Sequence, residues 1–115
     1  MVKIILSGEI GWEINPDDIR EKLDKAAGED LEVHMISPGG GVMSGIEIFN
    51  IFRDYKRDYP ESQNILLIKG FVASMGTYIA VNPAFDLVAA EDNVPWMIHN
   101  PYGGIVGYSA GARIC

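Results

Sequence analysis

A serine, a histidine and a glycine run are the residues of this chain best suited to covalent chemistry. Ser74 lies in the segment Gly70–Gly76, between an apolar run typical of a buried strand and a pattern typical of a helix. Unpaired N–H groups and the helix dipole favour negative charge at a helix N-terminus. That position suits a serine that attacks a carbonyl group and leaves an oxyanion. The simpler interpretation is an N-cap, because serine is a favoured N-cap residue.

A serine nucleophile needs a base, and the chain has two histidines. His34 lies inside a predicted strand whose neighbours Val33 and Met35 point to the opposite face, so we interpret it as a structural or surface residue. His99 ends a predicted strand and opens the turn-rich segment Asn100–Gly104. It is therefore the candidate general base.

Backbone N–H groups are the candidate donors to the oxyanion. One is the N–H of Met75, which follows Ser74 at the predicted helix start. The other comes from the run Gly39-Gly40-Gly41, where no Cβ blocks approach to the backbone. The same run also fits a plain strand-to-helix turn, or a cradle for phosphate. It does not match G-x-G-x-x-G, and no Lys-Ser/Thr pair follows it.

The elements that must position these groups alternate along the chain. We expect strands over Val2–Ser7, Leu31–Ser37, Ile65–Lys69, Asp86–Ala90 and Pro95–His99, and helices over Asn15–Ala27, Val42–Tyr59 and Ser74–Asn82, with another helix beginning at Gly107. This order predicts an α/β domain with a largely parallel sheet. Chemistry in such sheets gathers beyond the carboxyl ends of the strands, where three loops fall: Ser37–Gly41, Gly70–Ser74 and His99–Gly104.

Two of these helices have distinctive sequences. The first begins with Asn15 as the N-cap and Pro16 at the first helical position, followed by two acidic residues. The second, from Val42 to Tyr59, carries apolar residues on more than the single stripe that a surface helix needs. We expect it to be central or shared with another subunit.

The composition indicates one globular domain of 115 residues, with 48% hydrophobic and 22% charged residues. The net charge of −7 argues against binding to nucleic acid or an anionic membrane. No apolar run approaches the roughly 20 residues of a membrane span, and the N-terminus does not resemble a signal peptide. The single cysteine, Cys115, excludes an internal disulfide, so a cytoplasmic location is expected.

Three motifs, in this order, resemble the Clp-type serine peptidases. They are Ser37-Pro38-Gly39-Gly40 followed by Val42 and Gly45, then Gly70-Phe71-Val72-Ala73-Ser74-Met75-Gly76, then Met97-Ile98-His99-Asn100-Pro101 with Gly103-Gly104. The resemblance covers Val2 to Gly104. The variants between Gly41 and Asn50 are most similar to the phage-borne branch, whose members are proposed head-maturation (prohead) proteases.

The resemblance implies one ClpP/crotonase-like domain, residues 1–115, built of repeated strand-strand-helix units. It implies an ATP-independent serine endopeptidase with Ser74 as nucleophile and His99 as general base. Gly40 and Met75 would form the oxyanion hole through their N–H groups. A substrate peptide would add as a strand along two segments. The substrate-binding residues implied are Gly39, Gly41, Val42, Tyr102, Gly103 and Gly104.

The resemblance also implies partners. Subunits of this family assemble as homo-oligomeric rings, and a separate unfoldase or capsid proteins are possible partners. The substrate would be a peptide or protein, in the host cytoplasm if a phage encodes the chain. Neither nucleic acid, nor a membrane, nor a cofactor, nor a metal is expected.

The chain departs from the family pattern after His99. The third member of the family's triad is an acidic residue that follows a long helix, whereas this chain ends sixteen residues after His99. We expect that residue and the helical inter-ring handle to be missing, as in a C-terminally truncated fragment or a reduced relative. Asp86, Glu91 and Asp92 precede the histidine and are interpreted as solvated turn residues. Without an orienting carboxylate the imidazole can take the wrong tautomer, which lowers activity by orders of magnitude.

Three other functions remain open. A crotonase-type enzyme acting on acyl-CoA thioesters shares the fold and the oxyanion hole but needs no Ser–His pair. A membrane-linked branch of the family uses a Ser–Lys dyad, for which Lys69 is the only nearby lysine, and this is the least favoured alternative. A catalytically incomplete subunit would only assemble, or poison assembly, with longer copies.

Overall fold

The computed structural model describes residues 1–90, 94–100 and 103–109, with the backbone alone for 71, 94–100 and 103–109. The helices are α1 (Pro16–Ala26), α2 (Val42–Asp58) and α3 (Met75–Ala80). The strands are β1 (Val2–Ser7), β2 (Leu31–Ser37), β3 (Asn64–Val72), β4 (Leu87–Ala90), β5 (Val94–Asn100) and β6 (Gly103–Ser109).

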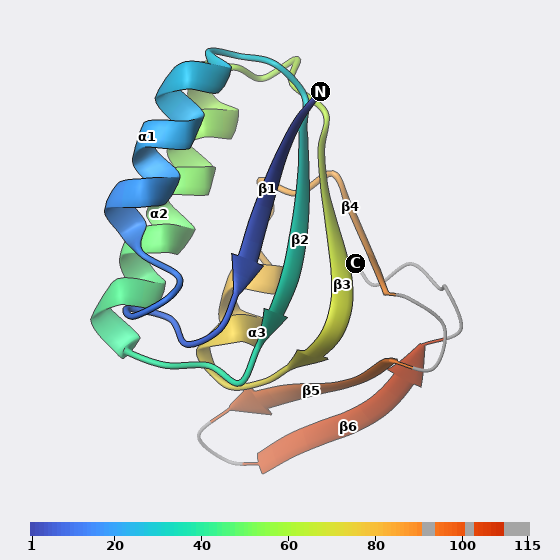
Figure 1. The fold of residues 1–115 in the computed structure, drawn as a ribbon. Coiled ribbons are helices and arrows are strands. Elements are labelled where there is room, and N and C mark those ends of the chain that lie inside the picture. The colour runs from blue at the N-terminus through green and yellow to red at the C-terminus, as the bar shows by residue number, and fades with distance from the viewer. Residues whose placement is uncertain (91–93, 101–102, 110–115) are drawn as a thin grey trace.

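The strands form one sheet in the order β1-β2-β3-β5-β6, with β4 also paired to β3. All pairs are parallel except β5 with β6. The edge of β3 that faces away from β2 pairs first with β4 and then, at Val72 and Trp96, with β5. Figure 1 shows α1 and α2 side by side on one face of β1, β2 and β3, and the β5–β6 hairpin beyond the carboxyl ends of those strands. The expected α/β domain with a largely parallel sheet is confirmed.

The core lies between the sheet and the two long helices. Alternate residues of the three long strands are buried, as period-two patterning requires. These strand residues are Ile4, Leu6, Val33, Met35, Leu66 and Ile68, and the helices contribute Ile19, Leu23, Ile48 and Phe52. The predicted start of α1 is confirmed, because the Asn15 side chain accepts a hydrogen bond from Asp17 N at 2.8 Å and Pro16 follows it.

Part of the apolar surface of α2 is buried because of the position of this helix in the fold. It packs against both α1 and α3, and Ile48, Ile51, Phe52 and Tyr55 are buried. Near its N-terminus, however, Val42 is 59% exposed and Met43 is 79% exposed. These side chains form an apolar surface that the described part of the chain does not cover.

The structure corrects three predictions about local structure. Gly107–Ser109 belong to β6 and not to a helix, and residues 110–115 lie outside the described residues. The expected turn Asn100–Gly104 contributes Asn100 to β5 and its two glycines to β6. Gly70–Val72 continue β3 and are not a loop. Glycine-rich strands carry little side-chain pattern, and here pairing with a neighbouring strand decides the conformation.

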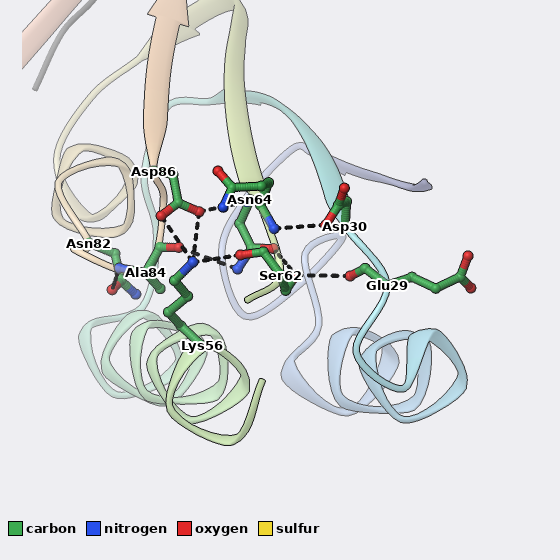
Figure 2. Close-up of polar contacts among 9 residues, drawn as sticks. Glu29, Asp30, Lys56, Ser62, Asn64, Asn82, Ala84 and Asp86 are labelled. Atoms are coloured by element: carbon green, nitrogen blue, oxygen red, sulfur yellow. Dashed lines mark hydrogen bonds and ion pairs between the residues drawn. The ribbon is translucent and has the colours of Figure 1, made fainter. Parts of the chain in front are cut away.

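A polar network joins the elements at the amino end of the sheet (Figure 2). Lys56 of α2 donates to the carbonyl oxygen of Ser62 and forms an ion pair of 3.0 Å with Asp86. Asp86 also accepts a 2.8 Å hydrogen bond from Asn64 N. The Ser62 hydroxyl lies 2.6 Å from Oδ1 of Asn64 and 2.9 Å from the carbonyl oxygen of Glu29. The network therefore connects α2 to the segments that precede β2, β3 and β4.

Within the described part of the chain, no helix combines the length and apolar character needed to cross a bilayer.

Candidate active site

Ser74 lies in the short turn between β3 and α3, at the carboxyl end of the central strand. Its backbone has φ 55° and ψ −126°, a conformation that residues with a Cβ rarely adopt. Such a residue costs about 1–3 kcal/mol and persists only where its surroundings impose it. Here the Ser74 carbonyl accepts hydrogen bonds from Thr77 N at 3.0 Å and Thr77 Oγ1 at 2.6 Å. The turn thus holds the serine in a strained and defined geometry.

The Ser74 side chain does not cap the helix that it precedes. It occupies the N-cap position of α3 but makes no capping hydrogen bond, and the residue is exposed. The N-cap interpretation is therefore correct for the backbone position and wrong for the side chain. The hydroxyl group is therefore not used in capping the helix.

Ser37 connects this turn to the glycine run. It is completely buried at the end of β2. Its carbonyl oxygen accepts from Ala73 N at 3.1 Å, and its Oγ accepts from Gly39 N at 3.1 Å. Sequence reasoning gave Ser37 no role of its own. A serine two residues before a loop glycine is nevertheless typical of a side chain that bonds the backbone ahead of it.

Two glycines lie where a side chain would not fit. A Cβ on Gly39 would lie 2.7 Å from Cβ and 3.2 Å from Oγ of Ser74, and the φ of Gly39 is +110°. A Cβ on Gly40, whose φ is +150°, would collide with the backbone of Ile10. Glycine at these positions lets the run lie directly against the serine on one side and against the β1–α1 loop on the other.

The contacts of the run leave one N–H group free beside the serine. Ile10 N donates to the carbonyl oxygen of Gly39, and Gly41 N donates to the carbonyl oxygen of Ile10, both at 2.9 Å. Among the described residues, the N–H groups of Gly40 and Met75 have no hydrogen-bond acceptor. Two unpaired backbone donors next to an exposed serine are what stabilisation of an oxyanion requires.

His99 reaches the same end of the sheet through β5. Val72 of β3 pairs with Trp96 of β5, and Ser74 and His99 follow this pair by two and three residues. In the antiparallel hairpin, His99 pairs with Gly104 of β6. The side chain of His99 is not among those described, and Tyr102 lies outside the described residues.

The other ionisable candidates lie elsewhere. His34 is half-buried in the middle of β2, 2.8 Å from Oε2 of Glu32, which agrees with a structural role. Asp86 lies at an exposed bend before β4, as predicted, but its carboxylate also holds Lys56 and Asn64 N in the network at the opposite end of the sheet. Glu91 and Asp92, also predicted as turn residues, lie outside the described residues.

Ser74, Gly40 and Gly41 are exposed. An open groove of about 630 Å³ does exist, but it lies between α1 and α2, and none of its lining residues comes from the segments that surround Ser74. In the described ranges, no group of three or more His, Cys, Asp or Glu side chains could hold a metal ion. Exposed backbone whose N–H groups have no acceptor among the described residues can pair with an extended peptide.

Comparison with known proteins gives consistent matches. A family model described as Clp protease matches residues 2–114. The ATP-dependent Clp protease proteolytic subunit of Borrelia garinii subsp. bavariensis is 29% identical over 115 residues, covering 96% of this chain and 56% of that protein. A ClpP1 mutant from Listeria monocytogenes has a similar fold, with a TM-score of 0.68 and 24% identity over 88% of this chain and 57% of the other. The chain thus spans about half the length of the relatives it matches, and the fold of the Listeria protein agrees with the expected one.

Proposed function

Because this chain belongs to the Clp protease family, we propose that it is a serine endopeptidase with Ser74 as nucleophile and His99 as general base. The observation that supports this most is the state of Ser74, which is exposed, strained and free of any capping bond. A family match to peptidases does not favour the acyl-CoA alternative. Backbone strain at a serine beside unpaired N–H groups is typical of a functional residue.

In the acylation step, Oγ of Ser74 attacks the carbonyl carbon of the scissile peptide bond while the His99 imidazole takes the hydroxyl proton. The carbonyl oxygen becomes an oxyanion, which accepts hydrogen bonds from the N–H groups of Gly40 and Met75. The intermediate collapses, the C–N bond breaks, and the leaving amine takes the proton from His99. The product is an ester of Ser74 and a free amine.

Hydrolysis of the ester repeats the same steps with water. His99 takes a proton from the water molecule, whose oxygen attacks the ester carbonyl, and the same two N–H groups hold the second oxyanion. Collapse releases the carboxylic acid and returns the proton to Ser74. We propose that the carboxylate that orients His99 is not one of these 115 residues. Of the acids that precede His99, Asp86 is engaged by Lys56 at the far end of the sheet.

The substrate strand is proposed to run along the glycine segment on one side and along Tyr102–Gly104 on the other. Gly39 and Gly41 already use their N–H groups on Ser37 and Ile10. Their role is thus to shape the surface, while Val42, whose N–H has no acceptor among the described residues, offers a donor to the substrate backbone.

Assembly and biological role form the finer part of the proposal. The exposed Val42 and Met43 of α2 support a contact with further copies of the chain in a ring. The variants from Gly41 to Asn50 support a place in the phage branch, with capsid or scaffold proteins as substrates in the host cytoplasm. A separate unfoldase is the alternative partner.

The experiment is labelling of the natural full-length protein with a fluorophosphonate probe, followed by mass spectrometry of the tryptic peptides. We expect one adduct, on Ser74. Ser74→Ala is the control and should abolish labelling, and His99→Ala should slow it by about 10³-fold or more because the serine loses its base. Absence of the adduct from the wild-type protein would refute the proposed function.

A further inference from the structure

The loop between β1 and α1, residues Gly8–Ile14, is folded around the backbone of Glu9. The carbonyl oxygen of Glu9 accepts hydrogen bonds from Trp12 N and Ile14 N, both at 3.1 Å. The N–H of Glu9 donates to Oε1 of Glu13 at 2.8 Å. Both polar backbone groups of Glu9 are therefore used within the loop, and one of these contacts depends on a side chain.

The next residue, Ile10, connects the loop to the oxyanion donors. Ile10 is buried and forms parallel bridges with both Ile14 and Gly40. Its N–H and carbonyl groups bond Gly39 and Gly41, so the peptide of Gly40 is held between two fixed points on one residue. The direction of the Gly40 N–H thus follows from the position of Ile10, which follows from the fold of the loop.

We propose that Glu13 is a positioning residue for the oxyanion hole, acting through Glu9 and Ile10 on the N–H of Gly40. The inference rests on the proposed role of Gly40. An oxyanion donor must lie within about 2.7–3.1 Å of the developing charge. A displacement of about 1 Å by a residue remote from the chemistry can lower a rate about 100-fold. Loss of the Glu13 carboxylate is therefore expected to slow the reaction more than it destabilises the fold.

The space around Glu13 supports a dedicated contact. A Cβ on Gly8, whose φ is +110°, would lie 2.5 Å from Oε1 and 2.7 Å from Cβ of Glu13. Glycine at this position is what lets the carboxylate fold back over the loop. A hydrogen bond from a backbone N–H to a carboxylate is stronger than one between neutral groups. Two independent substitutions, Glu13→Ala and Gly8→Ala, should therefore break the same contact.

The first test compares reaction rates of folded variants of the full-length protein. The readouts are kcat and KM for a p-nitrophenyl ester and the rate of labelling by a fluorophosphonate. We expect Glu13→Ala and Gly8→Ala to lower kcat and labelling by about 10- to 100-fold with KM changed less than about twofold. Glu13→Gln keeps an acceptor oxygen and should recover most of the rate. Asp18→Asn removes an equal charge from an exposed position on α1, outside the loop, and should react like the wild type.

The second test measures hydrogen–deuterium exchange by mass spectrometry. In Glu13→Ala, exchange should accelerate in the loop Gly8–Ile14 and at Gly41, whose N–H depends on Ile10. Asp18→Asn should leave both segments protected. Should Glu13→Ala fail to fold, Glu13→Asp takes its place, because its shorter side chain keeps the charge and withdraws the oxygen from Glu9.

The outcomes separate the two proposals. If the wild-type protein is not labelled at Ser74, the proposed function fails, and the rate test fails with it. If the wild type is labelled but the Glu13 and Gly8 variants react at the wild-type rate, the positioning role is refuted and the function stands. An equal loss in Asp18→Asn would also refute it, since the effect would then be one of charge.

Discussion

The strain at Ser74 predicts an unusual order of stabilities among its variants. Ser74→Ala keeps a Cβ at φ 55° and loses only an exposed hydroxyl that makes no capping bond. Its free energy of unfolding should lie within about 0.5 kcal/mol of the wild type. Ser74→Gly removes the Cβ and with it the cause of the strain. We therefore expect the glycine variant to be the more stable of the two inactive proteins.

The magnitude follows from two opposing terms. Relief of a residue in a sparsely populated conformation is worth about 1–3 kcal/mol. Glycine gains conformational freedom in the unfolded chain, which costs about 0.5–1 kcal/mol. The net stabilisation of Ser74→Gly over Ser74→Ala is thus about 0–2.5 kcal/mol, with a midpoint of about 1 kcal/mol. For a domain of this size, each kcal/mol raises Tm by about 3–6 °C.

The assay is urea unfolding followed by circular dichroism, with calorimetry for Tm, on the wild type and both variants. Both variants should also fail to react with a fluorophosphonate, so the difference in stability between them is not linked to a difference in activity. At an unstrained surface site, alanine is normally more stable than glycine. A glycine variant more stable than the alanine variant at position 74 would therefore indicate strain. If Ser74→Gly proves less stable than Ser74→Ala, Ser74 is not strained and the reasoning is wrong.

Three further predictions concern the scaffold. Burial raises the pKa of Tyr55 above its ordinary value. The stability that the protonated hydroxyl contributes is therefore complete below about pH 10, and it is lost as the pH rises through the folded-state pKa. Urea unfolding at increasing pH should show that loss in the wild type and not in Tyr55→Phe, which also forfeits the 2.7 Å bond to Glu29. A double-mutant cycle with Lys56→Met and Asp86→Asn should give a coupling of about 0.5–1 kcal/mol, because the pair is hydrogen-bonded but partly exposed to solvent; additive effects would contradict the network. Asn15→Ala should lower the free energy of unfolding by about 1 kcal/mol through loss of the helix cap, and unchanged unfolding would show that the cap is redundant.

Most helices and strands could be predicted, because helix capping and the alternation of apolar residues agree with the fold. Asn15 and Pro16 begin the first helix where capping rules place it, and Leu31–Ser37 alternates as a strand with one buried face. The strand-helix order then places the glycine run and Ser74 at one end of a parallel sheet. The sequence did not predict the strand over Gly103–Ser109, because its glycines interrupt the alternation of apolar and polar side chains. Pairing with β5 through backbone hydrogen bonds stabilises this strand.

Residue types and their order along the chain were sufficient to identify Ser74, His99 and the glycine run as candidates. The state of Ser74 could not be read from them, because a capping hydroxyl and a free one have the same sequence context. Its turn is held by the bond from Ala73 N to Ser37, by the close approach of Gly39 and by the bonds from Thr77, and these residues meet only in the folded chain. The support of Gly40 by Ile10 has the same origin. Long-range hydrogen bonds between loops leave no periodic pattern, and the folded arrangement alone brings those residues together.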